Sequence, residues 1–122
     1  MAVTYSNDVK EDRMQAVGAL LSAGGKIKIY TTGLGSLLST HVLQASGESF
    51  TNGVWTMALV SATVTAGNTG TAAEATITDS GDAVKISGLT VGTGSEDIVL
   101  DNTSINSGQD VTINSAVITH AA

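Results

Sequence analysis

Hydrophobic positions follow two different spacings along this chain, and the change falls at Gly24-Gly25. Before these glycines, the apolar residues recur at the spacing of one helical face. The residues of that face are Val9, Met14, Val17, Leu20 and Leu21. The run 6–8 offers three capping residues, and glycine accepts the left-handed conformation that ends a helix. The pattern predicts a helix over residues 6–23, preceded by an N-terminal arm of residues 1–5.

After the glycines, polar and apolar residues alternate in short segments, which is typical of half-buried strands. The segments are 26–31, 37–43, 55–59, 73–78, 83–87, 97–101 and 111–118, with shorter pieces at Leu89, Val91 and Ile105. Asn52-Gly53 predicts a tight turn, because both residues tolerate a positive φ. Asp79–Asp82 predicts the turn of a hairpin. The alternation slips at Asn114-Ser115, which predicts a β-bulge.

These elements predict a mainly β fold: a small β-sandwich or barrel of about seven or eight short strands over residues 26–120, with one N-terminal helix. A length of 122 residues fits a single domain, 1–122. The chain is 42% hydrophobic, so it does not resemble a disordered segment. No apolar run approaches the roughly 20 residues of a membrane-spanning helix. The absence of cysteine excludes disulfides and thiolate metal sites.

The balance of charged residues limits the classes of partner that this chain is expected to bind. Five basic residues stand against eleven acidic ones, for a formal net charge of −6. Nucleic-acid binding needs clustered Lys and Arg, and an anionic membrane surface would repel this chain, so neither partner is expected. The N-terminal residues lack a basic segment and an apolar segment, so no secretory signal is visible and synthesis in a cytoplasm is expected.

Candidate catalytic residues are sparse. The two histidines are His41 and His120, and no serine lies in a G-x-S-x-G motif. We expect His41 to be a surface-facing or hydrogen-bonded strand residue, and His120 lies close to the end of the sequence. Glu96 and Asp97 are adjacent, so on a strand their side chains would point to opposite faces. No enzymatic activity is expected.

Phosphate and metal sites are also incomplete. Gly33–Gly35 and Gly92–Gly94 each begin a G-x-G pattern, but both lack the third glycine, and no G-K-[ST] occurs. Asp79–Asp82, Asp97 and Asp101-Asn102 offer oxygen ligands, yet none matches the twelve-residue calcium loop. Asp and Asn are also ordinary turn formers. We expect no cofactor and no metal.

The remaining expectations concern the N-terminal arm and the single tryptophan. Val3 and Tyr5 alternate just ahead of the predicted helix. Tyr5 could pack on the first helical turns as a hydrophobic staple, or the arm could anchor itself on a neighbouring subunit. Val3 and Tyr5 are therefore the candidate partner contacts. We predict that Trp55 is buried on its strand, whereas a glycan-binding module would expose Trp55 or Tyr30 beside a polar groove.

Both ends of the chain resemble a recurrent group of short proteins from tailed-bacteriophage structural gene modules. The similar segments are Met1–Ser6, Ser87–Gly94, Asp97–Thr103 and Val111–Ala121. The resemblance implies a non-enzymatic virion protein that is made in the host bacterial cytoplasm and decorates or cements the capsid exterior. Its implied partners are the major capsid protein or other virion subunits, with a homo-oligomer expected. A tail, collar or fibre component and a host-surface or glycan-binding β module are the alternatives.

Overall fold

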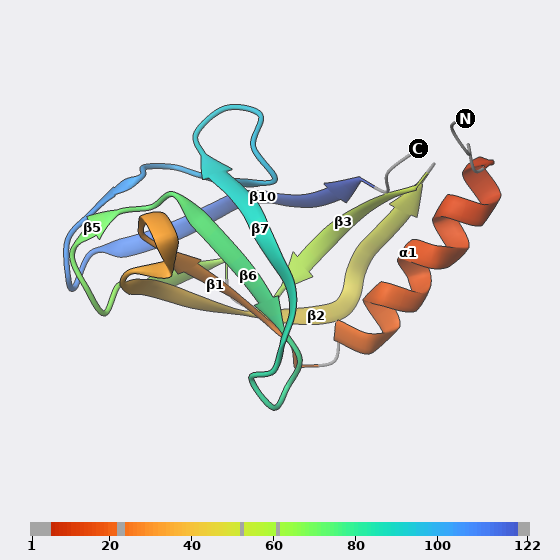
Figure 1. Ribbon diagram of the computed structural model, residues 1–122, viewed down its shortest axis with the longest axis horizontal. Coiled ribbons are helices and arrows are strands. Elements are labelled where there is room, and N and C mark those ends of the chain that lie inside the picture. Colours follow the sequence, from red (N-terminus) through yellow and green to blue (C-terminus); the bar gives the residue numbers. More distant parts are fainter. Residues whose placement is uncertain (1–5, 22–23, 52, 61, 120–122) are drawn as a thin grey trace.

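The computed structural model describes residues 6–21, 24–51, 53–60 and 62–119 (Figure 1). The elements in chain order are α1 (Asn7–Leu21), β1 (Lys26–Tyr30), the 3-10 helix η1 (Thr32–Leu34), β2 (Leu37–Thr51), β3 (Val54–Leu59), β4 (Thr63–Thr65), β5 (Gly70–Thr71), β6 (Glu74–Thr78), β7 (Val84–Gly92), β8 (Ile98–Leu100), β9 (Ser104–Ile105) and β10 (Asp110–Thr119). The predicted mainly β fold with one N-terminal helix is confirmed, and its architecture is a barrel.

Seven strands form the barrel, in the order β3-β2-β1-β6-β7-β8-β10. The ladder closes because β10 pairs back to β3. All barrel neighbours are antiparallel except β7 and β8. β4 pairs with the first residues of β10, before the part of β10 that pairs with β3, and β5 pairs with β9 in a separate two-stranded sheet. Closure gives every barrel strand a neighbour on both sides over at least part of its length, which shortens the free edges through which a small β protein could associate.

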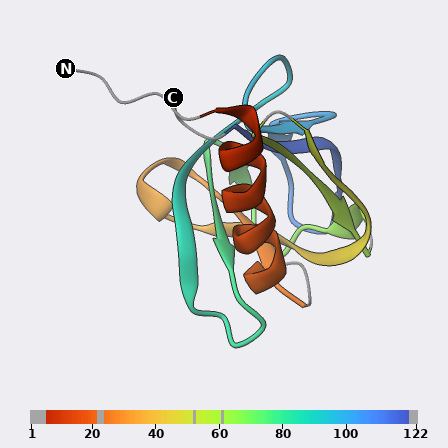
Figure 2. The same cartoon turned by 90° about the vertical axis from the view of Figure 1, so that its right-hand side faces the viewer.

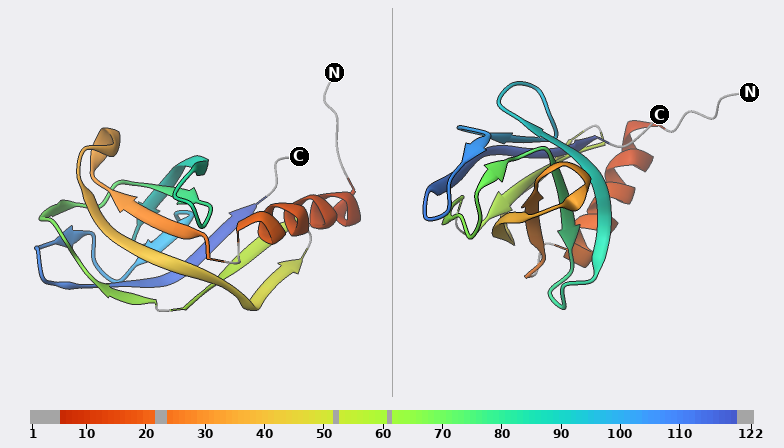
Figure 3. Two further views of the ribbon diagram at one scale, coloured as in Figure 1. Left: turned by 90° about the horizontal axis from the view of Figure 1, so that it is seen from below. Right: turned by 60° about the vertical axis from the view of Figure 1, so that its left-hand side comes forward.

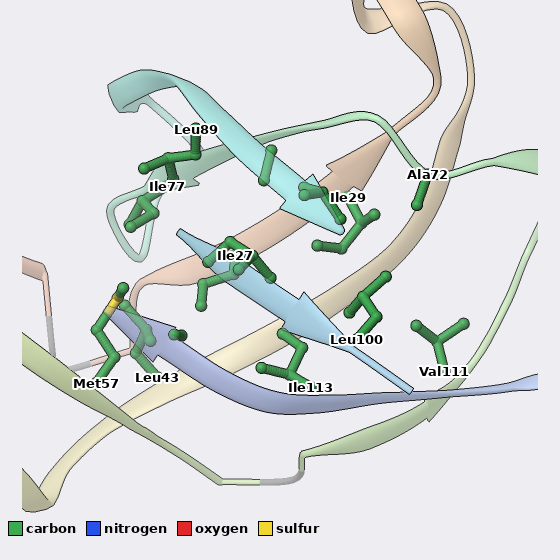
Figure 4. Close-up of a cluster of buried hydrophobic side chains, with 14 of the residues drawn as sticks. Ile27, Ile29, Leu43, Met57, Ala72, Ile77, Leu89, Leu100, Val111 and Ile113 are labelled. Atoms are coloured by element: carbon green, nitrogen blue, oxygen red, sulfur yellow. The ribbon is translucent and has the colours of Figure 1, made fainter. Parts of the chain in front are cut away.

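The barrel interior is filled by apolar side chains from all seven barrel strands (Figure 4). In β1 the predicted alternation is confirmed, since Ile27 and Ile29 are fully buried. Their directly paired residues on β2 are His41 and Ser39, and directly opposite residues share one face of a sheet. This register carries a histidine and a serine into the apolar interior.

The helix lies outside the barrel, along the far part of the β2–β3 hairpin (Figures 2 and 3). It buries Met14, Gly18 and Leu21. The predicted face is therefore wrong for two residues, because Val9 is 42% exposed and Leu20 is 61% exposed. Gly18 lacks a side chain at the contact, so the helix approaches its support closely on the side that holds Gly18.

Two further expectations on strands needed correction. β2 extends to Thr51, well past the predicted end at residue 43, because its outer part passes through a register shift between Gln44 and Ser49 where the alternation is lost. In β6 the predicted outward residues Thr76 and Thr78 are also buried. β6 lies between β1 and β7, and the paired Lys28 places a long side chain beside Thr76.

The predicted turns are found where expected. β2 and β3 meet across residues 52–53, where Gly53 has φ +79°; Asn52 lies outside the described residues. The bulge predicted at Asn114-Ser115 appears as a register shift between Ile113 and Ser115. The predicted helix of 6–23 is observed as Asn7–Leu21, with Ser22 and Ala23 outside the described residues.

Candidate functional site: an opening between two strands

The barrel wall has an opening between β2 and β4, here called the β2–β4 slot. Its volume is about 310 Å³, at the lower end of the range for ligand pockets. The lining residues are Leu37, Leu38, Ser39, Thr40, Val64, Thr65, Gly67 and Asn68. This concave feature of the described part of the chain is the candidate site.

The slot exists because one edge of β2 lacks a partner strand over part of its length. Among the described residues, β2 pairs with β1 on one side and meets β3 on the other only from Leu43 onward. Before Leu43, two backbone hydrogen bonds close this edge: Gly67 N donates to Leu38 O at 3.0 Å, and Val60 N donates to Val42 O at 2.9 Å. Backbone groups alternate between the two edges of a strand, so those of Thr40 face the slot between these two closures.

The opposite wall of the slot is β4. Every second residue along this segment points its backbone N–H and C=O groups at β10, away from the slot. Ile113 N donates to Ala62 O, and Ala66 N donates to Gln109 O, so these positions face β10. By the same alternation, the backbone groups of Thr65 face the slot. The slot thus presents backbone polar groups from two strands that do not pair with each other.

A buried serine–histidine pair lies at the inner side of the slot. Ser39 Oγ and His41 Nε2 are 3.0 Å apart, Ser39 is 4% exposed and His41 is fully buried. The hydrogen-bonded alternative for His41 is confirmed, and the surface-facing one is wrong, because the register with Ile27 turns His41 inward. Ser39 is the member of the pair that lines the slot. A hydroxyl beside an imidazole is the pairing used for nucleophilic catalysis, although enclosure of both groups limits access to them.

Both G-x-G segments hold a carboxylate of this same chain. Glu74 Oε2 accepts hydrogen bonds from Gly33 N and Leu34 N, the latter at 3.1 Å. Glu96 Oε1 accepts a hydrogen bond from Gly94 N at 2.9 Å. Backbone hydrogen bonds, of which the one from Gly94 has the largest effect, hold the pKa of Glu96 below its usual value. Backbone N–H groups of both G-x-G segments are thus used internally, for carboxylates of the same chain.

The remaining acidic candidates serve turns and strand contacts. Asp79 Oδ1 accepts from Gly81 N at 2.9 Å and from Ala83 N at 3.0 Å, which stabilises the predicted hairpin turn. Asp82 Oδ1 lies 2.8 Å from Lys26 Nζ, and the hydrogen bonds from Lys26 and then Lys28 lower the pKa of Asp82.

Asp97 and Asn102 also bind their own surroundings. Asp97 Oδ2 accepts from Thr90 N at 3.1 Å, whereas the Glu96 carboxylate turns to the neighbouring loop, so the two adjacent acids do not share one site. Asn102 Oδ1 accepts from Ser104 N at 2.9 Å. Within the described residues, no group of three or more His, Asp or Glu side chains is placed to hold a metal ion.

Trp55 is fully buried, as predicted. Its indole Nε1 donates to Glu48 Oε1 at 2.9 Å, and its ring stacks on Phe50 with centroids 6.1 Å apart. Trp55 therefore offers no exposed platform for a sugar. The predicted partner contacts Val3 and Tyr5, like His120, lie outside the described residues.

Comparison with family models, curated proteins and solved structures returns no match to this chain. In the described part of the chain, α1 is too short and too polar to cross a bilayer.

Sequence reasoning did not find the slot. Its walls come from residues 37–40 and 64–68, and nothing in either segment indicates that the two strands stop short of pairing.

Proposed function

We propose that this chain is a non-enzymatic structural protein of a tailed-bacteriophage virion that decorates or cements the capsid exterior. The observation that carries the proposal is the resemblance of both ends of the chain to short proteins of phage structural modules. The internal use of carboxylates in both glycine loops supports it, since these loops then need no anionic ligand.

The surface chemistry is compatible with such a role. A net charge of −6 keeps the chain soluble and repels it from packaged DNA. Repeated identical sites on a symmetric shell convert modest contacts into strong retention. Assembly also stabilises a small core by mass action.

The test is the copy number of this protein in purified virions, measured by quantitative mass spectrometry. A number on the order of hundreds per particle is expected for a shell component. A low number, as for a single ring, would move the proposal to the tail or collar. Absence from the particles would end it.

The Ser39–His41 pair favours one second candidate, a hydrolase. In that reaction Ser39 Oγ would attack an ester carbonyl while His41 Nε2 takes the hydroxyl proton and passes it to the leaving alcohol, and water would then release the acyl group. Labelling of the intact chain by a fluorophosphonate probe, abolished by Ser39→Ala, would support the hydrolase. We expect no labelling, because both groups are enclosed.

A further inference from the structure

We propose that His41 is an acid-sensitive switch in the barrel wall, and that a proton on its imidazole drives the β2–β4 slot open and admits water to the ring. This inference goes beyond the proposed function, since it requires neither a virion nor an oligomer.

The position of His41 makes its charge state matter to the fold. Among the described residues, the buried polar side chains are Ser39, His41, Thr76 and Thr78, and His41 is the one of them that titrates near neutral pH. The pairing with Ile27 turns the imidazole toward the apolar interior. Burial in such surroundings disfavours the charged form of a titratable group. The closed barrel therefore favours the neutral ring.

The charged residues around this part of the barrel are engaged elsewhere. On β1, Lys26 and Lys28 both bind Asp82 Oδ1, at 2.8 and 3.2 Å. On β2, Glu48 accepts a hydrogen bond from the indole of Trp55. The sequences of β3, β4 and β8 contain no charged residue. The charged residues of α1, and those of the strands across the interior, are exposed or half-exposed: Asp8, Lys10, Glu11, Asp12, Arg13, Glu74, Lys85 and Asp110. Solvent and salt screen charges at the surface, so burial is the main influence on the ring.

The slot supplies the movable part of the switch. The Ser39–His41 pair lies between the two backbone hydrogen bonds, from Gly67 and Val60, that close the slot. Ser39 lines the slot, and its Oγ lies 3.0 Å from His41 Nε2, so one small side chain separates the ring from the opening. On its other edge, β2 pairs with β1 through the same residues. The slot side can therefore open while β1 keeps β2 in the barrel.

The direction of the pH dependence follows from this difference in burial. In the open form the ring is exposed to water and takes up a proton near the ordinary imidazole value of about 6.5. The stability of the closed slot is therefore fully present above about pH 6.5 and is lost as the pH falls below it. Backbone or lysine hydrogen bonds lower the pKa of Asp82 and of Glu96, away from this pH range.

Amide hydrogen exchange between pH 7 and pH 5 tests the opening. After correction for the intrinsic exchange rate at each pH, the protection factors of the Gly67 and Val60 amides should fall by about tenfold per pH unit below about 6.5. The amides of β6, which pairs on both edges, should remain at least about tenfold better protected than these two at pH 5. Unchanged protection of Gly67 and Val60 would overturn the proposal. Protection in β6 as low as at the slot would also overturn it, because the whole chain would then be unfolding.

Two matched variants assign the acid response to one ring. The chain has two histidines, so His120→Gln leaves His41 alone, and this variant should keep the pH dependence of the Gly67 and Val60 amides. His41→Gln retains a side chain that can hydrogen-bond to Ser39 but cannot take up a proton, and it should remove that dependence. Equal pH dependence in the two variants would assign the response to other groups and refute the switch.

The His120→Gln chain also gives a measurement that survives a failure of His41→Gln to fold. Its single imidazole signal in carbon-13 NMR reports the charge of His41 directly. The signal of the charged ring should appear in step with the loss of protection at Gly67 and Val60. A ring that becomes charged while both amides stay protected would contradict the proposal.

Discussion

The contact between α1 and the β2–β3 hairpin gives a prediction whose sign depends on the tertiary structure. Gly18 faces Phe50, and a Cβ added at Gly18 would lie 2.9 Å from Phe50 Cε1 and closer still to Cζ. Phe50 cannot turn away freely, because its ring stacks on the buried Trp55 at an interplanar angle of 6°. The substitution Gly18→Ala therefore forces two aromatic rings to shift.

Two opposing effects set the magnitude. Alanine in a helix interior is more stable than glycine by about 1 kcal/mol. Overpacking of a filled contact costs about 1–3 kcal/mol. We expect the second effect to exceed the first, so that Gly18→Ala lowers the free energy of unfolding by about 1 kcal/mol. With Phe50→Ala already present, the clash is absent, and Gly18→Ala is expected to stabilise by about 1 kcal/mol.

The assay is a double-mutant cycle in urea, followed by far-UV circular dichroism and by the fluorescence of Trp55. A coupling of about 2 kcal/mol between the two positions is expected. If Phe50→Ala does not fold, Phe50→Leu serves as the partner variant. Stabilisation by Gly18→Ala in the otherwise unchanged chain would refute the packing of α1 on Phe50.

Three further outcomes are expected. Gly25→Ala should lower the free energy of unfolding in urea by about 3 kcal/mol or more, because the added Cβ would meet two backbone carbonyl oxygens that cannot rotate away. The matched control is Gly67→Ala, where an added Cβ has no atom within 4 Å, and it should change the free energy of unfolding by under about 1 kcal/mol. The hydrogen bond from Lys26 lowers the pKa of Asp82 in the folded protein. The contribution of this pair to the free energy of unfolding is therefore fully present above the ordinary aspartate pKa of about 4, and it is lost as the pH falls through the lowered pKa of the folded state. Asp82→Asn should therefore weaken the dependence of the urea midpoint on pH in the acid range. A variant with the same pH profile as the unchanged chain would count against the Asp82–Lys26 ion pair. Trp55 should emit at shorter wavelength than free tryptophan and resist quenching by acrylamide, and strong quenching would contradict its burial.

The local elements were largely predictable because their signals are local. Alternation identified Ile27 and Ile29 as inward residues, and the turn residues at 52–53 and 79–82 placed two hairpins. The slip in alternation at 114–115 correctly indicated a bulge. Each of these signals depends on the conformational preferences of a few consecutive residues, so no distant segment is needed to interpret it.

The orientation of the helix was only partly predictable. Its apolar residues occupy one broad arc of the helix, and their spacing does not say which part of that arc meets the barrel. The small Gly18 permits the closest approach, so Val9 and Leu20 were left exposed although the spacing had placed them with the core.

By itself, the sequence determined a mainly β chain with one helix, its turns and most of its inward-facing residues, because hydrophobic spacing and backbone preference act over neighbouring positions. Only the tertiary structure decided that the sheet closes into a barrel, that His41 and Ser39 turn into it, and that β2 and β4 stop short of pairing. The physical reason is that strand register and closure join residues far apart in the chain, so they depend on the whole fold being assembled at once.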